Sequence, residues 1–142
     1  MLKNNKLEFQ SFINNHRGVS FLNRFIQQAF EEDIGKGDHT TLATIPESAT
    51  GTATLLIKEA GVLAGVELAK HVFHQFDPEL KIEELKNEGS EVDKGMQAFT
   101  VTGKVRSILT TERLVLNFMQ YLSGVASKAS WLVHKIRDYD TE

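Results

Sequence analysis

Apolar residues recur every three or four positions in three stretches of the chain, which is the spacing of an amphipathic helix. The first stretch follows Ser20, which we expect to cap the helix, and stops at Gly35. The second covers Val66–Phe76 and is closed by Pro78. The third, Leu109–Ile136, keeps its apolar stripe over several turns. The pattern therefore predicts three helices, of which the last is the longest.

Strand patterns lie between these helices. In Ala98–Arg106, apolar residues alternate with threonine and lysine, the period-two pattern of a half-buried strand. Gly51–Lys58 and Leu80–Leu85 also read as strands, and Gly89–Gly95 is a turn-rich link. This order of elements predicts an α+β fold in which helices pack, sandwich-like, on a small mixed or antiparallel sheet. A long carboxy-terminal helix follows the sheet.

The same boundaries divide the chain into three parts. Residues 1–19 are a polar tail or short helix, residues 20–108 form the α/β sandwich domain, and residues 109–142 form the long helix. A chain of 142 residues has the length of one domain and can bury a real core.

The composition argues against several classes of function. The net charge of −3 offers no electrostatic reason to bind nucleic acid or an anionic membrane, so we expect neither as a partner. The chain has no cysteine, which excludes disulfides, thiolate catalysis and cysteine-based zinc sites. The amino terminus lacks the apolar core of a signal peptide, and no apolar run approaches the roughly 18 residues that span a bilayer. We therefore expect a cytoplasmic protein.

Arg113 is the candidate binding residue. With a helix starting near Leu109, it lies in the first turn, where the positive end of the helix dipole disfavours a cation by about 0.3–1 kcal/mol. A bound carboxylate or phosphate would explain a cation in that position. Arg113 also heads a polar stripe along the helix, whose further members are Asn117, Gln120, Gly124 and Ser127. The alternative is that this stripe is only a solvated face.

Other chemical patterns are weaker. The loop Glu31–Thr41 has two glycines, an aspartate and two threonines, so it suits either a phosphate nest or a structural helix end closed by Asp38. It matches neither nucleotide-binding glycine motif. His71 and His74 lie three residues apart on one helix, but zinc needs at least three protein ligands. No nucleophile elbow or carboxylate pair is found, so the chain shows no catalytic residue and no metal site of its own.

Three motifs together resemble the quinolinate phosphoribosyltransferases, also called nicotinate-nucleotide pyrophosphorylases (carboxylating). They are Glu32–Thr41, Ala60–Gly65 and Glu112–Ala126, of which the last is the most specific. Their order and spacing match the amino-terminal part of that family over about residues 20–137. The resemblance implies an amino-terminal sandwich domain that precedes an α/β barrel, and the barrel is absent from this chain.

This resemblance also implies a function. Enzymes of the family transfer phosphoribose from 5-phosphoribosyl pyrophosphate to quinolinate, releasing carbon dioxide and pyrophosphate and giving nicotinate mononucleotide for NAD synthesis. Magnesium accompanies the pyrophosphate substrate, and the enzymes are homo-oligomers. Their Glu-Arg arginine, here Arg113, binds quinolinate across the dimer interface. We expect the 142-residue chain to be inactive alone. The alternatives are a molybdenum-transport-type paralogue of the same architecture and a non-catalytic interaction module with a lipoyl-like sheet.

Overall fold

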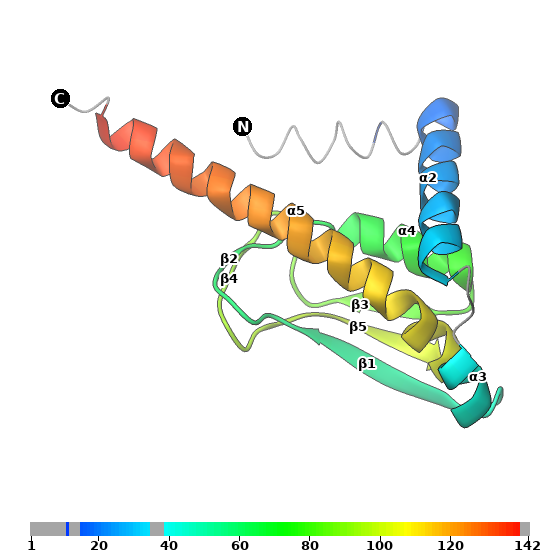
Figure 1. Ribbon diagram of the computed structural model, residues 1–142. Coiled ribbons are helices and arrows are strands. Elements are labelled where there is room, and N and C mark those ends of the chain that lie inside the picture. Colours follow the sequence, from blue (N-terminus) through cyan, green and yellow to red (C-terminus); the bar gives the residue numbers. More distant parts are fainter. Residues whose placement is uncertain (1–10, 12–14, 35–38, 140–142) are drawn as a thin grey trace.

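The computed structural model describes residues 11, 15–34 and 39–139 of the chain, and Figure 1 shows how their elements are arranged. The helices are α2 (His16–Ile34), α3 (His39–Thr44), α4 (Val66–Phe76) and α5 (Val105–Tyr139). The strands are β1 (Thr50–Leu56), β2 (Gly61–Val62), β3 (Lys81–Glu84), β4 (Glu91–Val92) and β5 (Gln97–Lys104).

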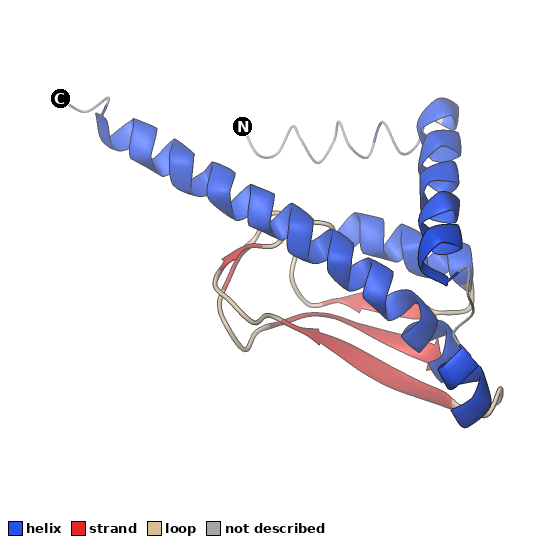
Figure 2. Ribbon diagram, in the orientation of Figure 1, coloured by secondary structure: helices blue, strands red, loops and turns tan. Residues whose placement is uncertain are grey.

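Three strands form an antiparallel sheet in the order β1-β5-β3, with β5 in the centre. Thr52 lies opposite Thr102, and their hydroxyl oxygens are 2.8 Å apart across the sheet. The short strands β2 and β4 pair separately. Figure 2 shows α2, α4 and α5 on one side of the sheet and α3 at its end, so the predicted α+β fold with a small antiparallel sheet is confirmed.

The core lies between this sheet and the helices. Helix α5 contacts the helices α2, α3 and α4 and the strands β1, β2 and β5, and α4 lies beside it (Figure 1). Buried apolar side chains come from helices and strands alike: Ile26, Phe30, Leu63, Val66, Ala69, Val72, Phe73, Leu80, Val92, Ala98, Phe99, Val101, Ile108, Leu114, Val115 and Met119. One continuous core therefore joins segments that are distant in the sequence, and α5 contacts most of the elements that form it.

Two predicted helix starts are wrong. Helix α2 begins at His16, four residues before Ser20, because the side chain of Asn15 accepts a hydrogen bond from the Arg17 N–H and caps the first turn. Helix α5 begins at Val105, directly after β5, and not at Leu109. The buried residues of its first two turns include Ser107 and Thr111, whose hydroxyls interrupt the apolar pattern.

The second half of α5 extends beyond the sheet (Figure 1). Its three consecutive apolar residues, Trp131, Leu132 and Val133, are 57%, 48% and 47% exposed. The core of the described residues therefore leaves this apolar run largely uncovered. Among the described residues, no helix has the length and apolarity needed to cross a membrane.

Candidate functional site

Arg113 lies in the third turn of α5, because the helix starts at Val105. The predicted first-turn position is therefore wrong, and the helix dipole no longer accounts for a bound anion there, since its effect falls off within the first turn. The side chain is 79% exposed, and its Nε is 3.8 Å from Oδ1 of Asp33. Arg113 is thus a solvent-facing cation that is paired at one side.

The packing of α2 against α5 brings Asp33 to Arg113. Ile26 and Phe30 are buried on one face of α2, and Asp33 follows on the same face, since the three residues are spaced by four and three. The rings of Phe25 and Phe118 stack with centroids 5.7 Å apart, which joins the two helices. The contact between Asp33 and Arg113 is therefore a consequence of how the helices pack.

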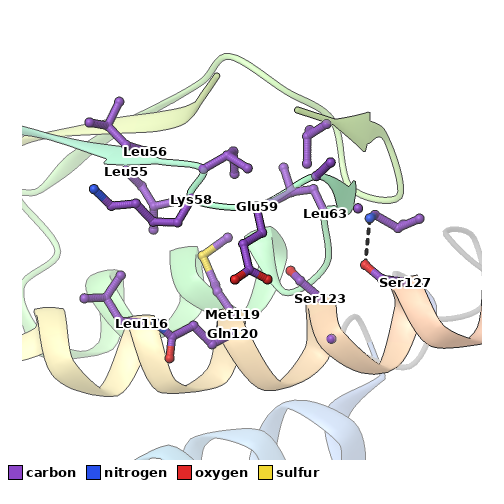
Figure 3. A pocket seen from close by; sticks show the side chains of 16 residues that line it. Leu55, Leu56, Lys58, Glu59, Leu63, Leu116, Met119, Gln120, Ser123 and Ser127 are labelled. Carbon is purple, nitrogen blue, oxygen red and sulfur yellow. Dashed lines mark hydrogen bonds between the residues drawn. The ribbon is translucent and has the colours of Figure 1, made fainter. Parts of the chain in front are cut away.

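A cavity of about 560 Å³ opens between the end of β1 and the middle of α5 (Figure 3). Leu55, Leu56 and Leu63 give it apolar walls, and Lys58, Glu59 and Gln120 add polar groups. The predicted polar stripe is split here, because Gln120, Gly124 and Ser127 line the cavity while Arg113 and Asn117 do not. An added Cβ at Gly124 would meet nothing within 4 Å among the described residues, so no close contact there requires glycine.

Two serines fasten α5 to the segment that contains β2. The Val62 N–H donates to Oγ of Ser127 at 2.8 Å, and the Ala64 N–H donates to Oγ of Ser123 at 3.0 Å. The Ser123 hydroxyl lies 3.1 Å from the Ala64 carbonyl, to which it donates. We call these contacts the serine clasp. Pattern reading missed it, although serines four residues apart on an apolar helix opposite a glycine-flanked segment are a usable signal.

Glu88 closes the amino-terminal end of α4. Its carboxylate accepts hydrogen bonds from the N–H groups of Gly65 and Val66, both at 2.7 Å, and from Glu67 at 3.3 Å. Gly65 has φ +92, which suits glycine, and it starts the helix without a side-chain cap of its own. The anion at this helix end is therefore supplied by the chain itself, 22 residues away from the first helical residue.

The other residues that the sequence suggested for a site are His71, His74 and Asp38. The His74 ring nitrogen is 3.2 Å from the Leu80 carbonyl, and burial lowers the pKa of His71 below its usual value. In the described part of the chain, no three histidine or acidic side chains gather as metal ligands. Asp38 lies outside the described residues, so its proposed loop-closing role is not examined by the structure. Arg113 remains the candidate for contact with an anion.

Comparison with known proteins identifies the family. Residues 38–123 match the family model described as the N-terminal domain of quinolinate phosphoribosyl transferase. The chloroplastic nicotinate-nucleotide pyrophosphorylase [carboxylating] of Oryza sativa subsp. japonica is 47% identical over 107 residues. That match covers 75% of this chain and 29% of the rice protein. A probable enzyme of the same name from Synechocystis is 37% identical, over 82% of this chain and 39% of the relative.

Solved structures agree with the sequence comparison. The nicotinate-nucleotide pyrophosphorylase from Francisella tularensis superposes with a TM-score of 0.77 at 34% identity, over 84% of this chain and 42% of that one. NadC from Streptococcus pyogenes gives 0.72 at 36% identity, over 75% and 38% of the two chains. The chain thus spans less than half the length of these relatives. It belongs to the quinolinate phosphoribosyl transferase family and corresponds to that family's N-terminal domain.

Proposed function

We propose that this chain is the amino-terminal domain of an enzyme that transfers phosphoribose from 5-phosphoribosyl pyrophosphate to quinolinate with loss of carbon dioxide. The product is nicotinate mononucleotide, a precursor of NAD. Membership of the family and the names of the relatives support this activity. The relatives are more than twice as long as the matched region, so the proposal assigns the reacting groups to the part of the enzyme that lies outside that region.

The exposed guanidinium of Arg113 is the observation that carries the proposal for this domain. Val115 and Met119 anchor the same helix in the core, which makes α5 a rigid support for the arginine. Quinolinate has two carboxylates, and a planar guanidinium binds a carboxylate through two parallel hydrogen bonds. We assign to Arg113 the binding of quinolinate in the active site of a neighbouring subunit, which makes the working enzyme a homo-oligomer.

The proposal also covers the metal that accompanies the substrate and the cellular location of the enzyme. Magnesium enters with 5-phosphoribosyl pyrophosphate, whose phosphates bind it in enzymes of this kind. Among the described residues, no three histidine or acidic side chains gather as metal ligands, and we assign no metal ligand to this chain. We place the enzyme in the cytoplasm, with neither nucleic acid nor membrane as partner. The small negative net charge supports the absence of those two partners.

Calorimetry of quinolinate binding tests the role of Arg113. The protein for this test joins the chain to the remaining part of the Francisella tularensis enzyme. We expect Arg113→Ala to weaken binding by about 1.5–3 kcal/mol, the scale of a hydrogen bond to a charged group. Arg24→Ala, which removes an exposed arginine from α2, is the matched control and should leave the affinity unchanged.

Two outcomes would contradict the proposal. Equal affinity of the Arg113→Ala protein and the unsubstituted protein would remove Arg113 from the site. Steady-state turnover of quinolinate by the purified 142-residue chain would show that the reacting groups lie within it, against the expectation that the chain alone is inactive.

A further inference from the structure

Asp33 stands in an unusual environment for a carboxylate. It lies in the last turn of α2, next to two further acidic residues, and that turn contains no basic residue. A negative charge at the carboxyl end of a helix is disfavoured by the helix dipole. Asp33 also continues the apolar face formed by Ile26 and Phe30, and its side chain is only 27% exposed. A cation from outside the helix would therefore stabilise a carboxylate placed there.

Arg113 of α5 is that cation. The contact joins Oδ1 of Asp33 to Nε of Arg113 at 3.8 Å, which is the distance of an ion pair without a direct hydrogen bond. Nε is the guanidinium nitrogen nearest the backbone. Among the described residues, Asp33 is the one ion-pair partner of Arg113. The side chain is 79% exposed, so the outer edge of the guanidinium faces solvent.

We propose that Asp33 is a positioning residue for Arg113, which holds the Nε side of the guanidinium and thereby turns the Nη1 and Nη2 pair outward to receive a carboxylate. This inference rests on the proposed role of Arg113 in binding quinolinate. A guanidinium presents two donor edges, and a carboxylate on the inner edge leaves the outer one free for a second carboxylate. Fixing the arginine before the ligand arrives lowers the rotamer freedom that binding must remove.

The packing of the two helices makes the arrangement specific to Asp33. Phe25 stacks on Phe118, and this contact sets the height of α2 along α5. Glu32, the preceding residue, is exposed and points away from the face that carries Ile26 and Phe30. Removing the charge of Glu32 therefore serves as a matched control, since it changes the local charge equally without touching the ion pair.

The contact is first tested in the chain itself. In nitrogen-15 NMR relaxation, the Nε–H group of Arg113 should have a higher order parameter than that of Arg24, an exposed arginine with no ion pair to Asp33, because the ion pair restricts the motion of the side chain. Asp33→Asn should lower the Arg113 order parameter to that of Arg24, and Glu32→Gln should leave it unchanged. Equal order parameters at Arg113 in the wild-type and Asp33→Asn chains would overturn the inference.

The effect on the ligand is tested in the fusion with the Francisella tularensis enzyme. We expect Asp33→Asn to raise the Kd for quinolinate about threefold to fivefold, the upper part of the range that exposed ion pairs give. The KM for 5-phosphoribosyl pyrophosphate should stay constant, and Asp33→Glu should restore part of the affinity. In an Arg113→Ala background, Asp33→Asn should have no further effect, because a positioning residue acts only through the arginine.

The outcomes separate this inference from the function on which it rests. If Arg113→Ala leaves the Kd unchanged, the proposed function fails and takes the inference with it. If Arg113→Ala weakens binding and Asp33→Asn does not, only the inference is wrong. A tighter Kd in Asp33→Asn also overturns it, since Asp33 would then compete with the ligand. An Asp33→Asn effect on the Kd that persists in the Arg113→Ala background would also overturn the inference, because Asp33 would then act on the stability of the fold and not through Arg113.

Discussion

Gly61→Ala is expected to break the serine clasp between β2 and α5. An added Cβ at Gly61 would lie 2.4 Å from Oγ and 3.3 Å from Cβ of Ser127, and the first distance is shorter than real contacts allow. Gly61 does not have a positive φ, so alanine fits its backbone conformation and the cost comes from the contact alone. To accept the methyl group, Ser127 must move away from the Val62 N–H to which it is bonded.

The magnitude follows from that hydrogen bond. A partly buried N–H left without an acceptor costs about 1–3 kcal/mol. Separating β2 from α5 also removes packing contacts, so we expect Gly61→Ala to lower the free energy of unfolding by about 2–3 kcal/mol. For a domain of this size, each kcal/mol corresponds to about 4 °C in melting temperature, which gives a decrease of about 8–12 °C.

Thermal and urea unfolding followed by circular dichroism measure this loss. Ser127→Ala removes the acceptor but also the crowding atom, and should cost about 1–2 kcal/mol. The double variant Gly61→Ala/Ser127→Ala should therefore fall short of the sum of the single losses by about 1 kcal/mol or more. Additive losses, or a Gly61→Ala chain within about 0.5 kcal/mol of wild type, would refute the reasoning.

Three further predictions use the same unfolding measurements. Gly124→Ala should stabilise the chain by about 1 kcal/mol, because alanine is the better helix former and its Cβ meets nothing within 4 Å; a loss of stability would show that this space is filled. Glu88→Gln should cost about 1–2 kcal/mol through the lost charge at the start of α4, while Glu91→Gln, an exposed neighbour, should cost nothing measurable. Burial lowers the pKa of His71, so the unfolded chain binds more protons as pH falls below about 6.5; stability should decrease there, and this part of the decrease should be missing in His71→Gln.

The extent of α4 illustrates a prediction made by pattern alone. The predicted range Val66–Phe76 is the observed one, because a local apolar stripe and a closing proline at position 78 decide where that helix lies. The start of α5 illustrates the opposite case. Ser107 and Thr111 are buried polar residues, whose hydroxyls bond to Asp77 and to the Ser107 carbonyl. A prediction based on apolar spacing passes over them, and this error placed Arg113 four residues, about one turn, too close to the helix start.

The sequence by itself determined the order of the helices and strands and the family. Periodicity, turn residues and the three motifs depend only on positions that are close together in the chain. The neighbours of each functional side chain were decided by the tertiary structure. Asp33 meets Arg113 across 80 residues because α2 packs on α5, and Ser127 meets Gly61 because β2 crosses the same helix. Such contacts depend on helix packing and close approach of backbone, which residue spacing along one segment does not encode.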